Sequence, residues 1–279
     1  MPATQSALSY DVFVAPEKPF VAPAPAVGEA PAWDPTTSTL IFGASDAVLV
    51  DPLMTVPEAT ALADWVGLHH RNLTTIYITH GHGDHYLGLP VVLDRFPDAR
   101  PVAAPGTVRH MHREDTQPRD NTLRARFPNQ IADTIPLPEP LESPEIQLEG
   151  AAIEVIETGH TDTLDTTALH VRDLGLIVSG DVAYNHCHMY VGDTTTAGRA
   201  EWMAALDRLA ALNPTAVVTG HKDPTQGNPP AVLAESRGYL EYYGQLRDEG
   251  LPDQQLFDAM VDRYPSWVSR QQFLILGLS

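Results

Sequence analysis

Four side chains able to bind a metal ion lie within one run of six residues, His80-Gly81-His82-Gly83-Asp84-His85. The run follows directly on the apolar segment 73–79, so we expect a strand that ends in a metal-binding loop. The two glycines allow the backbone to turn tightly, so that side chains of one short loop can face two different ions. A structural zinc site rarely needs such a loop, and the pattern therefore predicts a metal centre that performs chemistry.

The run resembles the His-x-His-x-Asp-His signature of the metallo-β-lactamase superfamily, and that family's other ligands can be sought along the chain. His160, Asp181 and His221 each follow an apolar, strand-like stretch that ends in glycine. A lone histidine at a strand end is more often structural, but accident is a poor explanation for seven candidates in family order. The resemblance covers residues 38–222 and implies these ligands: His80, His82, Asp84, His85, His160, Asp181 and His221.

The resemblance also implies how these ligands share two divalent ions. The first two histidines of the run and His160 would hold one ion. The last two residues of the run and His221 would hold the other, and Asp181 would bridge the pair. Asp51, which ends the strand-like stretch 47–50, would orient the metal loop. Such ligands suit Zn²⁺, which we expect, but Fe, Mn or Co could occupy the same set.

The chemistry of such a pair of ions is hydrolysis. Two ions about 3.5–4 Å apart can share a hydroxide whose pKa is pulled toward about 7, while one ion polarises a carbonyl. A carboxylate on the second ion can take up the proton for the leaving group, and we expect Asp84 in that catalytic role. We therefore predict a hydrolase of small acyl substrates that opens a lactone or cleaves a related carboxylic ester.

A tyrosine three residues beyond the bridging aspartate bears on the substrate. Asp181-Val182-Ala183-Tyr184 is similar to an arrangement in the N-acyl homoserine lactonases of the superfamily. The similarity implies a catalytic Tyr184 whose hydroxyl donates to the substrate carbonyl or to the leaving oxygen. The alternative is a tyrosine that packs behind the metal loop.

Other activities found in the superfamily stay open. Thioester hydrolysis of the glyoxalase II type is the main alternative, although no glutathione-binding pattern is recognisable. A β-lactamase is less favoured because we recognise no secretory signal. An iron oxidoreductase of the flavin-linked kind would need a glutamate where His82 stands. A non-catalytic metal-binding protein is disfavoured by the full ligand set.

Two further clusters carry weaker expectations. His186-Cys187-His188 follows the bridging aspartate closely, and we expect His188 to line the pocket or to contact Asp193. Five arginines lie within residues 109–126, where they could receive a substrate carboxylate or pair with neighbouring acids. Of these two roles, we expect surface ion pairs.

The elements that position these residues indicate an α/β fold. The pattern of strands and helices, with the resemblance, predicts a four-layer αββα sandwich with a helical C-terminal tail. We divide the chain as one domain with a proline-rich arm (1–37), a metal-binding core (38–222) and the tail (223–279). A hairpin is expected over 38–50. Helices are expected over 57–68, 84–96 and 199–212, and strands near 152–157, 167–172, 175–179 and 215–219.

Composition narrows the range of partners. The formal net charge of −19 repels phosphate backbones and argues against a nucleic-acid partner. No apolar run approaches the roughly 20 residues that a membrane span requires, and no signal peptide is recognisable. The single cysteine, Cys187, excludes an intramolecular disulfide and favours the cytoplasm. Aromatic residues in the tail, including Trp267 and Phe273, could pack on the chain's own core or on a second subunit, and of these we expect a homodimer.

Overall fold

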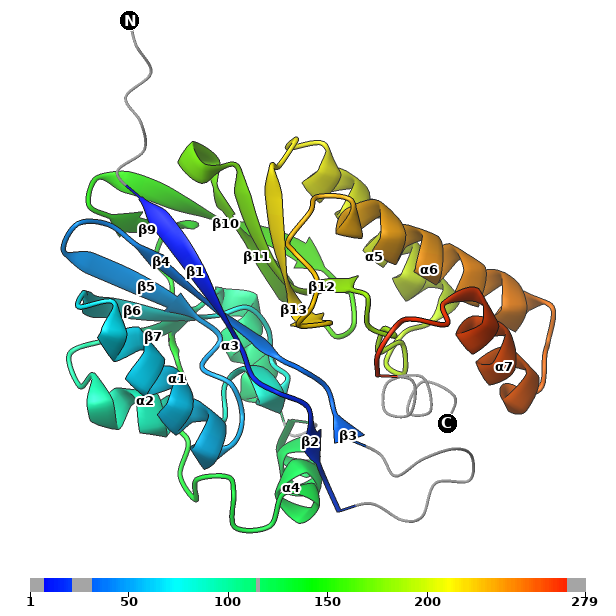
Figure 1. Ribbon diagram of the computed structural model, residues 1–279, viewed down its shortest axis with the longest axis horizontal. Coiled ribbons are helices and arrows are strands. Elements are labelled where there is room, and N and C mark those ends of the chain that lie inside the picture. Colours follow the sequence, from blue (N-terminus) through cyan, green and yellow to red (C-terminus); the bar gives the residue numbers. More distant parts are fainter. Residues whose placement is uncertain (1–7, 22–31, 114–115, 270–279) are drawn as a thin grey trace, which may run out of the picture.

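The computed structural model describes residues 8–21, 32–113 and 116–269, without the side chains of 116–119. In this part of the chain two β-sheets lie face to face, and helices cover the outer face of each (Figure 1). The predicted α/β sandwich with C-terminal helices is confirmed. Within the described residues, no helix is both long and apolar enough to cross a membrane.

The first sheet brings together strands from the N-terminal half of the chain. Its central strands are parallel, whereas its first three pair antiparallel, and β4 with β5 forms the hairpin expected over 38–50. Its order is β1 (Ser9–Val14), β4 (Thr37–Phe42), β5 (Asp46–Val50), β6 (Asn72–Ile78), β7 (Arg100–Ala103) and β8 (Glu139–Pro140).

The second sheet comes from the C-terminal half. Its strands pair antiparallel except for β12 and β13, which run parallel. Its order is β13 (Ala216–Lys222), β12 (Leu176–Asn185), β11 (Thr166–Val171), β10 (Ala151–Gly159) and β9 (Glu145–Leu148). A separate short pair consists of β2 (Lys18–Pro19) and β3 (Ala32–Trp33).

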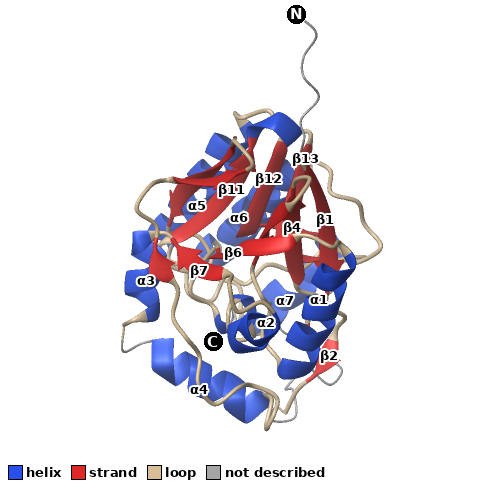
Figure 2. Ribbon diagram, turned by 90° about the vertical axis from the view of Figure 1, so that its left-hand side faces the viewer, coloured by secondary structure: helices blue, strands red, loops and turns tan. Residues whose placement is uncertain are grey.

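Helices form the outer layers and the tail. In Figure 1, α1 and α2 lie outside the first sheet, and α5 and α6 lie outside the second. In Figure 2, β6 of the first sheet runs across the direction of β11 and β12. The helices are α1 (Val56–Leu68), α2 (Leu89–Arg95), α3 (Pro105–Met111), α4 (Thr116–Arg126), α5 (Thr196–Ala210), α6 (Val232–Asp248) and α7 (Asp253–Arg263), with single 3-10 turns η1 (Gly83–His85) and η2 (Arg172–Leu174).

Alternation along the strands produces the layers, because successive side chains of a strand point to opposite faces. In β5, Leu49 packs toward the helices of its own sheet, whereas Val48 packs between the two sheets. In β12, Ile177 packs toward α5 and α6, and Val178 faces the first sheet. Each sheet is therefore apolar on both faces, and three buried layers of side chains hold the sandwich together.

The helix expected over 84–96 begins later than predicted. Gly83–His85 forms only the turn η1, and α2 spans Leu89–Arg95. The backbone of Gly88 packs closely against Pro52, since a Cβ on Gly88 would lie 2.3 Å from the carbonyl oxygen of Pro52. A regular helix would also spread successive side chains around its axis, whereas both Asp84 and His85 turn into one buried centre.

Candidate metal centre

Imidazole and carboxylate side chains converge where the end of β6 meets the second sheet. The Thr167 amide and hydroxyl both donate to the Thr79 carbonyl oxygen, at 3.1 and 2.7 Å, which joins the sheets beside the loop. Within each of two groups, the ligand atoms lie within 4.8 Å of one another. The outer group contains His80, His82, Asp162 and Asp181. The inner group contains Asp84, His85 and His221.

Asp181 lies between the two groups. Its Oδ1 is 3.3 Å from His85 Nε2, and its Oδ2 is 3.3 Å from His221 Nε2. The same Oδ2 lies 3.9 Å from His80 Nε2 in the outer group. Because Asp181 reaches both groups, it occupies the place that a bridging ligand needs.

The spacing of these atoms fits divalent ions. Two ligand atoms on one tetrahedral zinc, each bound at about 2.0–2.1 Å, lie about 3.3 Å apart. His221 Nε2 and Asp84 Oδ2 are 3.3 Å apart in the inner group, and His80 Nε2 and Asp162 Oδ2 are 3.5 Å apart in the outer group. The facing atom His80 Nε2 is buried and has no hydrogen bond from the described residues. Buried polar atoms without such a partner are expected where a cation completes them.

The pKa values of the histidines differ between the two groups. Burial alone would lower the pKa of His221, but the carboxylates of Asp181 and Asp84 raise this pKa to about 10. In the outer group, burial lowers the pKa of His80 to about 4, and nearby His85 acts in the same direction. Burial would raise the pKa of Asp181, yet His221 and His85 hold it well below its usual value. At neutral pH the metal-free inner group therefore retains a proton that an ion must displace.

Asp51 orients the metal loop from behind. Its Oδ2 accepts hydrogen bonds from His85 Nδ1 at 2.9 Å and from the Thr79 hydroxyl at 2.7 Å. Since the Thr79 hydroxyl donates to Asp51, it accepts from His80 Nδ1 at 2.9 Å. Both imidazoles therefore carry a proton on Nδ1 and turn Nε2 toward the centre, which is how an outer carboxylate fixes metal-binding histidines.

A model of the metallo-beta-lactamase superfamily matches residues 31–221 of the chain. The chain belongs to this superfamily. Among curated relatives, it is 35% identical over 77 residues to the hydroxyacylglutathione hydrolase of Actinobacillus pleuropneumoniae serotype 5b (strain L20), covering 28% of this chain and 31% of the relative. It is 30% identical over 191 residues to the hydroxyacylglutathione hydrolase of Xylella fastidiosa (strain M12), covering 66% and 58%. The chain thus spans less than two thirds of the length of either relative.

Solved structures agree on the fold. A metallo-beta-lactamase family protein from Thermus thermophilus aligns with a TM-score of 0.61 at 19% identity, over 93% of this chain and 90% of that one. The DIM-1 metallo-beta-lactamase aligns with a TM-score of 0.60 at 16% identity, over 85% and 94%. At such identities the likeness shows the architecture alone.

His160, the remaining ligand that the superfamily pattern implies, is not in either group. It is half-buried, and its Nε2 lies 3.2 Å from the carbonyl oxygen of Asp193. Asp162, two residues later in the same turn, faces the outer group instead. The sequence-based prediction overlooked Asp162, and the available signal was a second potential ligand two residues after His160.

Tyr184 lies behind the centre. Its side chain is fully buried, and its hydroxyl donates to Asp181 Oδ2 at 2.9 Å. Its ring stacks on His221, with ring centroids 5.6 Å apart. Burial raises the pKa of this phenol well above its usual value, and Asp181 adds to the effect. In this arrangement the hydroxyl holds the shared carboxylate of Asp181.

Trp33 is a site residue that the sequence did not reveal. Its indole Nε1 donates to Asp84 Oδ2 at 3.3 Å from β3, within the segment assigned to the proline-rich arm. The next residue, Asp34, is also completely buried, and burial raises its pKa to about 7 despite the opposing charge of His221. The arm therefore contributes contacts to the inner group.

His188 lies away from both groups. It is fully buried, and its Nδ1 is 3.2 Å from the hydroxyl of Tyr239 on α6, with Trp267 packed against its ring. Cys187 is buried beside it, and burial raises the pKa of its thiol well above the usual value. The two residues belong to the packing of the C-terminal helices against the second sheet.

The expected ion pairs of the arginine-rich segment are absent at two positions. Among the described residues, neither Arg124 nor Arg126 has an acidic group at ion-pair distance. Arg124 donates to the carbonyl oxygen of Ile131 at 3.4 Å, and the half-buried Arg126 lies over the ring of Phe20. The prediction of ion pairs is wrong for these two residues, because backbone and aromatic partners lie nearer.

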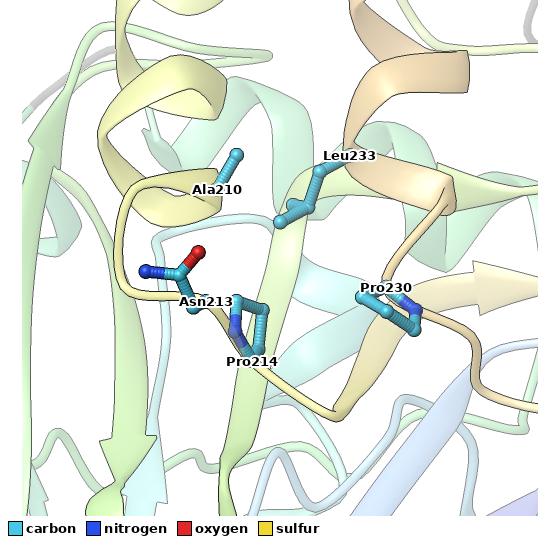
Figure 3. A pocket seen from close by; sticks show the side chains of 5 residues that line it. All are labelled: Ala210, Asn213, Pro214, Pro230 and Leu233. Carbon is cyan, nitrogen blue, oxygen red and sulfur yellow. The ribbon is translucent and has the colours of Figure 1, made fainter.

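A pocket elsewhere on the molecule lies between the C-terminal end of α5 and the start of α6 (Figure 3). It has a volume of about 270 Å³ and is lined by Ala210, Asn213, Pro214, Pro230 and Leu233. These side chains include no titratable or nucleophilic group. This pocket therefore offers no side chain for acid–base or nucleophilic chemistry.

Proposed function

We propose that this protein is a metal-dependent hydrolase that binds two divalent ions, with Zn²⁺ as the first candidate, and opens a lactone or cleaves a related carboxylic ester. The observation that carries the proposal is the position of Asp181, which lies 3.3 Å from ligand atoms of two inner-group imidazoles and 3.9 Å from one in the outer group. One shared carboxylate between two sets of ligands is the arrangement that a dinuclear site requires.

Divalent ions bound here would supply a water molecule of lowered pKa and an electrophile for the substrate carbonyl. Side chains of this protein would orient the ligands and transfer a proton. Asp51 and Thr79 hold the imidazoles in the required tautomers. Asp84, whose Oδ2 faces His221 and accepts from Trp33, is the carboxylate that we propose carries a proton to the leaving group.

For Tyr184 we propose a positioning role. Its hydroxyl donates to Asp181 and its ring is buried against His221, so it fixes the shared carboxylate between the two groups. Direct donation to a substrate oxygen, the role implied by the lactonase resemblance, would require this hydroxyl to leave Asp181.

Thioester hydrolysis is the second candidate function. The observation in its favour is that the curated relatives named above are hydroxyacylglutathione hydrolases. The same ligand groups serve both candidates, since a thioester and an ester present the same acyl carbon to a nucleophile.

The experiment follows proton release with a pH indicator. Metal-loaded protein and an Asp181→Ala control are mixed with acyl-homoserine lactones, simple γ- and δ-lactones, aryl esters, S-lactoylglutathione and a cephalosporin. Metal-dependent turnover of lactones and esters, absent from the control, is the expected result. Faster turnover of S-lactoylglutathione would select the second candidate, and no turnover of any substrate by fully metallated protein would reject both.

We also propose that the protein acts in the cytoplasm on a small molecule and binds no nucleic acid. The single, buried cysteine and the formal net charge of −19 support this. A homodimer remains a prediction for size-exclusion chromatography with light scattering. That prediction rests on aromatic residues of the tail. Of these, Trp267 stacks on Tyr239 of the same chain, and Phe273 lies outside the described residues.

A further inference from the structure

We propose that Asp162, in place of His160, completes the outer group, so that its ion is held by two imidazoles and two carboxylates. This inference rests on the proposed metal-binding function. Asp162 Oδ2 lies 2.8 Å from His82 Nδ1 and 3.5 Å from His80 Nε2, and the side chain is fully buried. These are the two imidazole atoms that a third ligand of the same ion must approach.

The turn that carries Asp162 is built to hold its carboxylate in this direction. The Thr161 hydroxyl donates to Asp162 Oδ1 at 2.8 Å, and the hydroxyls of Thr161 and Thr166 are also 2.8 Å apart. Thr166 in turn donates to the carbonyl oxygen of Gly159 at 3.0 Å. One carboxylate oxygen is thus fixed by the protein, whereas Oδ2 faces the nitrogens of His82 and His80, where a cation would bind.

His160 is engaged on the other side of the turn. A carbonyl oxygen can only accept, so His160 Nε2 carries a proton and donates it to Asp193. The opposite edge of the ring lies against the start of α5, where a Cβ on Gly198 would be only 3.1 Å from Nδ1. His160 therefore contacts the Asp193 carbonyl and the start of α5, and neither of its nitrogens belongs to the outer group of ligand atoms.

The exchange of an imidazole for a carboxylate changes the ion that the outer group prefers. Imidazole ligands suit zinc, whereas carboxylate oxygens are harder donors that suit ions such as Mn²⁺. With Asp162 and Asp181 both present, the outer group also carries one more negative charge than the three-imidazole set of the superfamily pattern. We therefore expect the outer group to discriminate less strongly in favour of Zn²⁺ over Mn²⁺ than it would with a histidine at position 162.

The test measures metal stoichiometry and affinity without any substrate. Metal-free wild type, Asp162→Asn, Asp162→Ala and His160→Gln are loaded, dialysed and analysed by inductively coupled plasma mass spectrometry, and affinities are measured by chelator competition. Glutamine at 160 removes the imidazole but keeps a donor for the Asp193 carbonyl, and asparagine at 162 keeps the shape of the side chain. Circular dichroism confirms that each variant is folded.

Wild type and His160→Gln are expected to keep two ions, whereas both Asp162 variants lose one, with affinity for the second ion falling by more than about 100-fold. In a further variant, Asp162→His, the ratio of Zn²⁺ affinity to Mn²⁺ affinity at the outer group is expected to rise above that of wild type. Loss of an ion from His160→Gln, or two ions retained by the Asp162 variants, would overturn the inference while leaving the proposed function intact. Wild type that binds no ion would instead overturn the proposed function.

Discussion

The inner and outer groups of the metal centre differ in how the protein supports them. His85 and His221 of the inner group are fully buried, with Asp51 behind one and Tyr184 stacked on the other. In the outer group, His82 has a slightly exposed side chain and lies 3.9 Å from Asp193, whose own side chain is one-third exposed. The outer group is therefore closer to solvent than the two buried histidines of the inner group.

The largest effect is expected where the two groups meet. Asp181→Ala removes a carboxylate whose oxygens face imidazole nitrogens of both groups, so we expect both ions to bind more than about 100-fold more weakly. Activity should disappear with the metal. Chelator competition measures this, and one ion kept at wild-type affinity would show that the groups are independent.

Substitution of Asp51 tests how the protein orients the ligands of the inner group. The residue has a φ of +58°, a left-handed conformation that asparagine tolerates, so Asp51→Asn changes the charge with little backbone strain. We expect metal affinity to fall about 10–100-fold, because His85 and Thr79 lose their anionic acceptor.

The matched control for Asp51→Asn is Asp173→Asn, on the exposed turn η2. It makes the same chemical change far from the ligands and should leave metal affinity unchanged. Equal affinity losses in the two variants would mean that general electrostatics, and not orientation of His85, explains the effect.

The two groups should also respond differently to pH. His221, with a pKa of about 10 in the metal-free protein, must lose a proton before it binds an ion, whereas His80, with a pKa of about 4, is already neutral at pH 7. For every proton that the ion displaces, the metal affinity of the inner group should therefore fall about tenfold with each unit that the pH drops below about 10. Calorimetry in buffers of different ionisation enthalpy counts the released protons, and no release at pH 7 would contradict this.

The smallest effect is expected at Tyr184. Tyr184→Phe removes one buried hydrogen bond to a charged group, so unfolding free energy should fall by about 1.5–3 kcal/mol. Metal retention should weaken only modestly. Tyr239→Phe removes a buried hydroxyl that pairs with His188, and it should lower stability without any change in metal retention. A larger fall in kcat than in metal affinity for Tyr184→Phe would favour direct donation to the substrate.

Much of the fold could be predicted because it depends on local patterns. Successive residues of a strand point to opposite faces, which places Val48 and Leu49 in different buried layers, and the hairpin over 38–50 follows from two apolar runs around a short turn. The helix expected from Asp84 was predicted to begin too early, because Asp84 and His85 both turn into the buried centre and α2 begins only at Leu89. The helix propensities of these residues give no information about the buried centre.

The sequence by itself determined that the run from His80 to His85 supplies four candidate ligands of the centre, since residues of one short loop are neighbours in any fold. It indicated His160 and not Asp162, although the two residues share one turn and their side chains have different partners. Nor could it place Trp33 on Asp84 or the Tyr184 hydroxyl on Asp181. Only the tertiary structure decides these contacts, because the direction of a side chain in a turn depends on partners that lie far away along the chain.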